Sequence, residues 1–345
     1  MKKTMTTNSY VMLNNDISII RKYEARLFDG RKKATCAFPN CNNECYPNDG
    51  SMRIITPSHK RGITICNYHV DFVGSYSHEN NDFLGKVTDD GITVSCELET
   101  SENTTISRAV LSCDFECYPS DDGSLDGCEP IEWKTPVYNS KQGFIKLLGT
   151  FEGMLNNGYI EMDYTCGSHL HTGLSNNSID FRYIFKDIDE YYQAFSGVYD
   201  YLKNMNENKM IEYFGRDFVS YARYIEKSES ESTDFRNIYY IKHNDGIGLR
   251  ISGEEDLEGT GSYNCDVHRL AFNFQHSYSM EFRLARFASA KQYRKIAIVC
   301  MNMVIALRDY YNKAITYNHL KPFNVLTLEG LNNYFVALFK ENFPY

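Results

Sequence analysis

Alternation of apolar and polar side chains marks two segments as β-strands with one charged face each. In the stretch GITVSCELET every second residue from Ile92 is apolar, and Glu97 and Glu99 fall on the opposite side. The stretch YSMEFRLARF alternates in the same way and brings Glu281 and Arg283 to one side. Because side chains in a strand repeat their direction every second residue, each charged pair shares a face. We therefore predict strands that bury one face and present charge on the other.

A third stretch, CGSHLHTG at residues 166–173, separates two histidines by one residue and encloses them between glycines. On a strand, His169 and His171 point to the same side, about 6 to 7 Å apart. This spacing suits two ligands of one site, although exposed or hydrogen-bonded histidine pairs also have it. The pair becomes a candidate site only in combination with the carboxylates of other strands.

Apolar residues three and four positions apart predict three long amphipathic helices. They cover residues 140–157, about 188–205 and about 292–311. Ser140 is a suitable N-cap for the first helix, and Gly158 is a suitable stop. Helices together with alternating strands indicate an α+β protein.

Composition and charge exclude several classes of protein. The chain has 345 residues, of which 36 are basic and 45 acidic, and its net charge of −9 argues against a general binder of nucleic acid or anionic membranes. The longest strongly apolar run, residues 296–307, is too short to span a bilayer, and the start of the chain lacks the apolar core of a secretion signal. We therefore expect a soluble, cytoplasmic protein.

The distribution of charge and cysteine divides the chain into two parts. Residues 1–35 carry eight basic and three acidic residues, and the next 35 residues hold four of the eleven cysteines. We predict an N-terminal module over 1–78 and a catalytic domain over 79–345, with an acidic insertion at about 226–258. Within that domain, residues 79–132 carry fourteen acidic residues against two basic ones. Such a density of carboxylates requires either open water or cations.

The cysteines of the N-terminal module have the spacing of a zinc site. Cys36 and Cys41, followed after 24 residues by Cys66 and His69, resemble a zinc ribbon or treble clef, which binds one Zn²⁺ tetrahedrally. Cys45 is an alternative to Cys41 as the fourth ligand. A closed site of this kind predicts a structural role, and unliganded surface thiols are the alternative.

The charged faces of the strands share one chemistry. Carboxylates from two strands and an imidazole are ligands suited to Mg²⁺ or Mn²⁺. An arginine beside them suits a phosphate or a carboxylate, because its guanidinium binds either group in a bidentate manner. With divalent ions bound, such a cluster can hold the phosphates of a nucleotide.

These motifs, in this order, resemble the amidoligase family of glutamine-synthetase-like, ATP-dependent ligases of bacteria and phages. The resemblance covers roughly residues 90–300. The motifs that carry it are E-x-E (Glu97, Glu99), DGS (Asp122 to Ser124), EWKTP (Glu132 to Pro136), CGSHLHTG (Cys166 to Gly173), FGRDFVSYAR (Phe214 to Arg223) and EFRLARF (Glu281 to Phe287). The resemblance implies a glutamine-synthetase-like catalytic domain, in which helices back a curved antiparallel sheet whose concave face holds divalent cations and ATP.

The resemblance also implies roles for individual residues. The metal ligands for Mg²⁺ or Mn²⁺ are Glu97, Glu99, Glu132, His169 and Glu281. His171 lies nearer the nucleotide phosphates, and Arg216 and Arg283 hold phosphate or a substrate carboxylate. Asp122 is a weaker candidate, because DDGS is also a common turn sequence. Phosphoryl transfer at such a site needs positioning and charge neutralisation more than a covalent nucleophile.

The function expected from these residues is an ATP- and Mg²⁺-dependent ligase that joins a carboxylate to an amine through an acyl phosphate. The candidate substrates that the resemblance implies are peptides, protein side chains, polyamines or cell-wall components, and the expected location is the cytoplasm of a bacterium or a phage-infected host. We expect a monomer or dimer. A metal-dependent hydrolase that uses the histidine pair and the carboxylates to activate water is one alternative. A catalytically silent binding protein on the same scaffold is another.

Overall fold

The computed structural model describes residues 24–27, 33–38, 41–47, 49–55, 59, 61–71, 91–120, 125, 127, 130–138, 141–174, 179–185, 188–216, 238–243, 246–251, 271–274, 276–313 and 323–345. Asp122 and Ser140 lie outside these residues. So do residues 72–90, which contain the predicted boundary at 78/79.

A curved, six-stranded sheet forms the centre of the protein, and every pair of neighbouring strands in it is antiparallel. In the order in which they lie in the sheet, the strands are β14 (Phe272–Asn273), β15 (Ser279–Phe282), β11 (Ser168–Leu174), β6 (Ile92–Thr100), β9 (Ile131–Lys134) and β8 (Tyr118–Ser120). The long strands β6 and β11 are central, so their side chains have neighbours on both sides. The predicted α+β class and the antiparallel sheet are confirmed.

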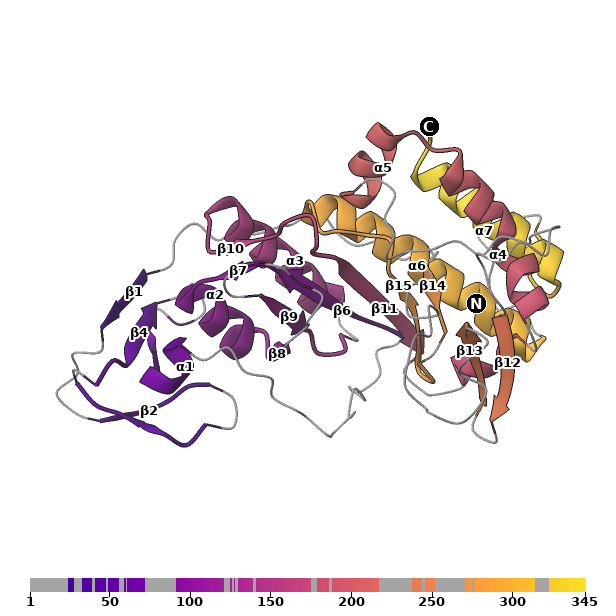
Figure 1. The fold of residues 1–345 in the computed structure, drawn as a ribbon. Coiled ribbons are helices and arrows are strands. Elements are labelled where there is room, and N and C mark those ends of the chain that lie inside the picture. Colours follow the sequence, from indigo (N-terminus) through magenta and orange to yellow (C-terminus); the bar gives the residue numbers. More distant parts are fainter. Residues whose placement is uncertain are drawn as a thin grey trace, which may run out of the picture.

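Helices cover the apolar face of this sheet (Figure 1). Helix α6 (Ala290–Asn312) packs on β11 and β6, and α3 (Lys141–Asn156) packs on α6. Leu98 of β6 and Leu170 of β11 are fully buried in the main core beneath them. Burial of each such leucine stabilises the fold by about 2 kcal/mol.

Three further helices extend the layer. They are α4 (Ile188–Lys203), α5 (Glu207–Phe214) and α7 (Leu328–Asn342). Helices α4 and α7 lie side by side at the end of the molecule that is farthest from the N-terminal strands (Figure 1). Gly197 of α4 lets α7 approach closely, because a Cβ there would lie 2.7 Å from a methyl group of Val336. None of the described helices is both long and apolar enough to cross a membrane.

The described part of the N-terminal region forms small sheets around a second core. Its elements are β1 (Glu24–Leu27), β2 (Ala34–Thr35), β3 (Glu44–Cys45), β4 (Met52–Ile55), β5 (Ile63–Ile65) and α1 (Asn67–Asp71). Strands β1, β4 and β5 form one sheet, and β2 and β3 form another. The buried cluster includes Cys36, Ile54 and Ile65, together with Ala109 from outside the region. The N-terminal region therefore packs against the rest of the protein.

That packing is made by α2 (Thr105–Ala109) and the π-helical turn η1 (Val110–Asp114) that continues it. Nη1 of Arg108 donates a hydrogen bond of 2.9 Å to the carbonyl of Val70. Nδ1 of His59 lies 2.6 Å from Oδ1 of Asp114, and the Cys113 thiol donates to a backbone carbonyl of the N-terminal region. These polar contacts and the shared core fix the region against α2 and η1.

The remaining elements are short: β7 (Glu102–Asn103), β10 (Ile160–Glu161), η2 (Phe181–Tyr183), β12 (Ile238–His243) and β13 (Gly246–Ile251). The three predicted long helices are present as α3, α4 and α6, with ends within a few residues of those expected. The predicted strand around Glu281 is shorter than expected, because β15 ends at Phe282. The segment predicted as an acidic insertion at 226–258 contains the paired strands β12 and β13.

Candidate functional site

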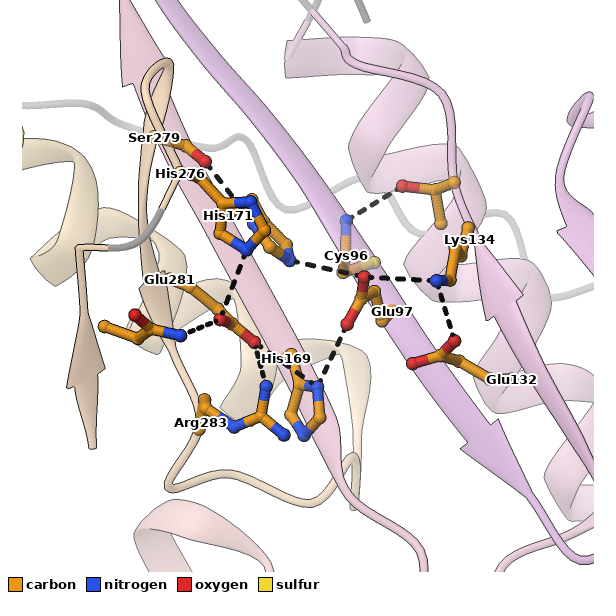
Figure 2. Close-up of polar contacts among 12 residues, drawn as sticks. Cys96, Glu97, Glu132, Lys134, His169, His171, His276, Ser279, Glu281 and Arg283 are labelled. Carbon is orange, nitrogen blue, oxygen red and sulfur yellow. Dashed lines mark hydrogen bonds and ion pairs between the residues drawn. The ribbon is translucent and has the colours of Figure 1, made fainter. Parts of the chain in front are cut away.

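The polar face of the sheet carries the charged side chains that the sequence placed on one side of each strand. In the register of the sheet, Glu97 of β6 lies opposite His169 of β11, and Glu281 of β15 lies opposite His171. On the other side of β6, Glu132 of β9 pairs with Glu99. Strand pairing thus brings together residues that are up to 184 positions apart in the sequence. Figure 2 shows the convergence of the side chains of Glu97, Glu132, His169, His171 and Glu281.

His169 is at the centre of this cluster. Its Nδ1 lies 3.0 Å from Oε2 of Glu97 and 3.5 Å from Oε1 of Glu281, and its Nε2 lies 3.4 Å from Oε1 of Glu99. The imidazole is buried, with 7 % of its residue surface exposed. A buried imidazole among three carboxylates is stable either when it is protonated or when it and the carboxylates bind the same metal ion.

Glu132 completes the carboxylate group from the neighbouring strand. Nζ of Lys134 lies 3.1 Å from Oε2 of Glu132 and 3.9 Å from Oε1 of Glu97 (Figure 2). Lys134 was not predicted from the sequence, although it lies two residues from Glu132 in the EWKTP motif and so shares its face. Its ammonium offsets part of the negative charge of the cluster.

Glu281 forms the opposite side of the site. Nδ2 of Asn273 donates a hydrogen bond of 2.8 Å to Oε2 of Glu281, and the Arg283 guanidinium donates to Oε1. His276, in the turn between β14 and β15, brings its Nε2 within 3.6 Å of Oε2 of Glu281. Asn273 and His276 were not predicted, because their sequence neighbourhood has no alternation that assigns a face.

His171 lies between Glu97 and the β14–β15 turn. Its Nδ1 is 3.4 Å from Oγ of Ser279, and its Nε2 is 3.7 Å from Oε1 of Glu97. The His171 and His276 rings meet edge to face with their centres 5.0 Å apart. The histidine pair of β11 therefore contacts two different neighbourhoods, His169 among the carboxylates and His171 beside a second histidine.

Arg216 reaches the site from the end of α5. The helix ends at Gly215, whose φ of +76° is in the left-handed region, and the chain then turns back toward the sheet. A Cβ built at Gly167 would lie 3.0 Å from both Nη1 of Arg216 and Oε2 of Glu99. Glycine at 167 therefore leaves room for the buried guanidinium beside the Glu99 carboxylate. The Gly167 amide also donates to Glu99.

The proximity of these groups changes their proton affinities. Burial raises the pKa of Glu97, but hydrogen bonds from His169 and His171 outweigh burial and hold that pKa well below its usual value. Burial acts on Glu281 in the same direction, and the contact with His276 and the nearby cations bring its pKa down to about 2. Burial lowers the pKa values of the two β11 histidines, yet the hydrogen bonds to Glu97 raise them overall.

Glu132 behaves in the opposite way. Burial and the adjacent charge of Glu97 raise the pKa of Glu132 to about 7, even though Lys134 is nearby. Burial is the main cause of this raised pKa, and the neighbouring Glu97 carboxylate adds to it. A cation bound beside Glu132 would favour its charged form.

Two groups of three side chains have the proximity that a metal ion requires. Glu97, Glu132 and His169 form one group, and His171, His276 and Glu281 form the other; within each, one ligand atom per residue lies within 4.8 Å of the others. All eight residues predicted at this site from the motifs lie on or beside the polar face: Glu97, Glu99, Glu132, His169, His171, Arg216, Glu281 and Arg283. Their roles as ligands stay predictions.

Cys166 of the glycine-flanked motif takes no part in this face. Its thiol donates to Oδ1 of Asp163 over 3.6 Å. Burial raises the pKa of Cys166 to about 12, so the side chain stays protonated near neutral pH. A nucleophilic role for Cys166 has no support in this geometry.

A separate cluster in the N-terminal region can hold a metal ion. Ligand atoms of Cys36, Cys41, Cys66 and His69 all lie within 4.8 Å of one another. Nδ1 of His69 is 3.5 Å from Sγ of Cys36 and 3.3 Å from Sγ of Cys66. Cys36 and Cys66 are buried, and the Phe38 ring stacks on the imidazole of His69 at 4.2 Å. Three thiolates and one imidazole form a composition typical of structural zinc.

The positions of the ligand atoms also distinguish Cys41 from Cys45 as the fourth ligand. Cys45 is fully buried in β3 and lies outside the group of four. Burial raises the pKa of Cys66, but amide hydrogen bonds from His69 and Asn43 outweigh it and lower that pKa overall. A lower pKa favours the thiolate, which is the form that binds a metal. Because the group of four contains Cys41 and not Cys45, Cys41 is the better fourth ligand.

The nine cysteines in the described part of the chain are all free thiols.

No protein-family model, curated protein or solved structure matches the chain.

Proposed function

We propose that this protein is an ATP- and Mg²⁺-dependent ligase that joins a carboxylate to an amine, with a glutamine-synthetase-like catalytic domain. The observation that carries the proposal is the convergence of Glu97, Glu132, His169 and Glu281 on one polar sheet face, with Arg283 beside them. The order of the motifs that resemble the amidoligase family supports the same reading. The antiparallel sheet backed by helices agrees with it.

The carboxylates fit a cation that binds phosphate. Glu97, Glu99 and Glu132 offer hard oxygen ligands suited to Mg²⁺ or Mn²⁺, and a bound cation would favour the charged form of Glu132, whose pKa is raised by burial and by Glu97. Bound Mg²⁺ would neutralise the phosphates of ATP and hold them in line for transfer. The guanidinium groups of Arg283 and Arg216 would bind the transferred phosphoryl group or the substrate carboxylate.

The reaction has two balanced steps. In the first, an oxygen of the substrate carboxylate attacks the γ-phosphorus of ATP, the bond to the β-phosphate oxygen breaks, and ADP leaves. In the second, the amine nitrogen attacks the acyl carbon, inorganic phosphate leaves, and the nitrogen gives up a proton. The residues of the cluster hold the charged groups in place through both steps and form no covalent bond to the substrate.

The Cys36, Cys41, Cys66 and His69 cluster would hold Zn²⁺ in a structural role. A closed set of four protein ligands leaves no position for a substrate or an activated water. The ion would tie the small N-terminal sheets into one unit that packs on α2 and η1.

One observation favours a second candidate, a metal-dependent hydrolase. His171, His276 and Glu281 offer two imidazoles and one carboxylate, a set of ligands that catalytic zinc sites use to activate water. Such an enzyme needs no nucleotide, and this difference separates the two candidates.

A coupled assay for ADP and phosphate tests the proposal. Purified protein is incubated with ATP, Mg²⁺ and pools of carboxylic acids and amines, and product masses are measured in the active pools. A ligase releases ADP over repeated turnovers only when both an acid and an amine are present. Glu97→Gln should abolish turnover, whereas Glu161→Gln, on the exposed end of β10, should retain it. Hydrolysis of ester or peptide pools without ATP would contradict the ligase, and silence in every pool would favour a binding protein.

A further inference from the structure

His276 adds a second imidazole to the site at a position that the strand motifs do not include. It lies in the turn between β14 and β15, with its ring edge to face against His171 at 5.0 Å. Its Nε2 lies 3.6 Å from Oε2 of Glu281, whose carboxylate is held in place by Asn273. Two imidazoles and one anchored carboxylate therefore face a common point (Figure 2).

The hydrogen bonding of His171 leaves one of its nitrogens available. Nδ1 lies at hydrogen-bond distance from Oγ of Ser279. Nε2 is buried and lies 3.7 Å from Oε1 of Glu97, which is beyond hydrogen-bond distance, so this nitrogen has no hydrogen-bond partner among the described residues. A buried polar atom without a partner is rare and calls for an explanation such as a bound ion. Histidine ligands of metals commonly bind the ion with one nitrogen and hydrogen-bond a neighbouring group with the other.

We propose that His171, His276 and Glu281 bind a divalent transition-metal ion such as Zn²⁺ or Mn²⁺, at a site distinct from the carboxylate-rich Mg²⁺ site. Imidazole nitrogens are preferred by transition metals, whereas Mg²⁺ prefers oxygen ligands and keeps much of its water. The two neighbouring groups of ligands therefore select different metals. Glu97, Glu132 and His169 present mostly oxygen, and this site presents mostly nitrogen.

The geometry needs only a small adjustment to bind an ion. The three ligand atoms lie within 4.8 Å of one another, and ligands around a tetrahedral ion at about 2.0 Å lie about 3.3 Å apart. The ring of His276 supplies that movement, because its side chain is 49 % exposed on a turn. Glu281 and His171 are held by Asn273 and Ser279, so the site closes mainly by motion of His276.

The proposed site does not rest on ligase activity, and its test uses no nucleotide. Full-length protein is first loaded with Zn²⁺ at the cysteine cluster and then titrated with Mn²⁺ in a large excess of Mg²⁺, with free Mn²⁺ followed by electron paramagnetic resonance. We expect one Mn²⁺ that resists displacement by Mg²⁺. Pulsed measurements on this ion should show coupling to two imidazole nitrogens.

Variants of the turn and of the Mg²⁺ site provide the decisive comparison. His276→Gln should weaken Mn²⁺ binding by at least about tenfold and leave coupling to one nitrogen. Tyr278→Phe, an exposed neighbour in the same turn, should bind as the unmodified protein does, and Glu132→Gln should retain the Mn²⁺. Unchanged Mn²⁺ affinity in His276→Gln, or full displacement of Mn²⁺ by Mg²⁺ in the unmodified protein, would overturn the proposal. Either result leaves the ATP-dependent assay unaffected.

Discussion

Replacement of Glu132 by glutamine tests two effects of the carboxylate cluster: how much it destabilises the metal-free protein, and how much it contributes to Mg²⁺ binding. Glutamine keeps the size of the side chain and removes its charge. Because the pKa of Glu132 is raised from 4.5 to about 7, the folded state favours the protonated form. Its contribution to stability is fully present below pH 4.5 and is lost as the pH rises through 7. The difference between the two pKa values corresponds to about 3 kcal/mol of unfolding free energy.

Glu132→Gln should therefore stabilise the protein in the absence of Mg²⁺, and only at high pH. At pH 8 the gain approaches about 3 kcal/mol, which for a chain of this length raises Tm by about 4 °C. At pH 4.5 to 5 the variant and the unmodified protein should unfold at nearly the same temperature. The measurement is calorimetric unfolding of zinc-loaded protein across this pH range without added Mg²⁺.

Addition of Mg²⁺ should offset most of this difference in stability between the two proteins. Saturation at about one hundred times Kd stabilises the unmodified protein by about 2.7 kcal/mol, whereas Glu132→Gln has lost a ligand and gains less. Glu161→Gln, at an exposed position on β10, is the matched control and should follow the unmodified protein throughout. A stability difference that is independent of pH, or an equal response of Glu132→Gln to Mg²⁺, would refute the reasoning.

Two further predictions concern the metals. Mg²⁺ affinity, measured by calorimetric titration, should rise by at least about tenfold from pH 6 to pH 8. The reason is that protons on Glu132 and His169, whose pKa values are both raised, compete with the ion. An affinity that does not change with pH would contradict this prediction. Cys66→Ser should lose the zinc of the N-terminal cluster, lower Tm by several degrees and make residues 33–71 sensitive to limited proteolysis. The control variant Cys113→Ser should keep its zinc. A full complement of zinc in Cys66→Ser would argue against the four-ligand site.

The local sequence pattern was sufficient to predict which side chains share a face of a regular strand. Alternation placed Glu97 with Glu99, and His169 with His171, because direction in a strand is a local property. The three long helices followed from their apolar spacing for the same reason. Which strands pair, and in which register, depends on tertiary contacts that alternation does not encode. The neighbourhood of His169 and Glu281 therefore came from the family resemblance and not from periodicity.

The pattern of apolar and polar residues did not predict the positions of side chains that lie outside regular strands and helices. His276 lies in a turn, and its approach to Glu281 depends on the pairing of β14 with β15. Arg216 was expected from a motif alone, and its position depends on how the chain turns at Gly215. In the cysteine cluster, spacing left Cys41 and Cys45 equivalent. The tertiary structure distinguishes them, because the group of ligand atoms contains Cys41 and not Cys45.

The placement of β15 and α6 late in the chain has a consequence for biosynthesis. Strands β6 and β11 leave the ribosome well before Glu281, Arg283 and the helix that covers their apolar side. A nascent chain that ends near residue 270 therefore contains Glu97, Glu99 and Glu132 but lacks Glu281, Arg283 and α6. The charged face and the helix that packs directly behind it can be completed only after synthesis has entered the last quarter of the polypeptide.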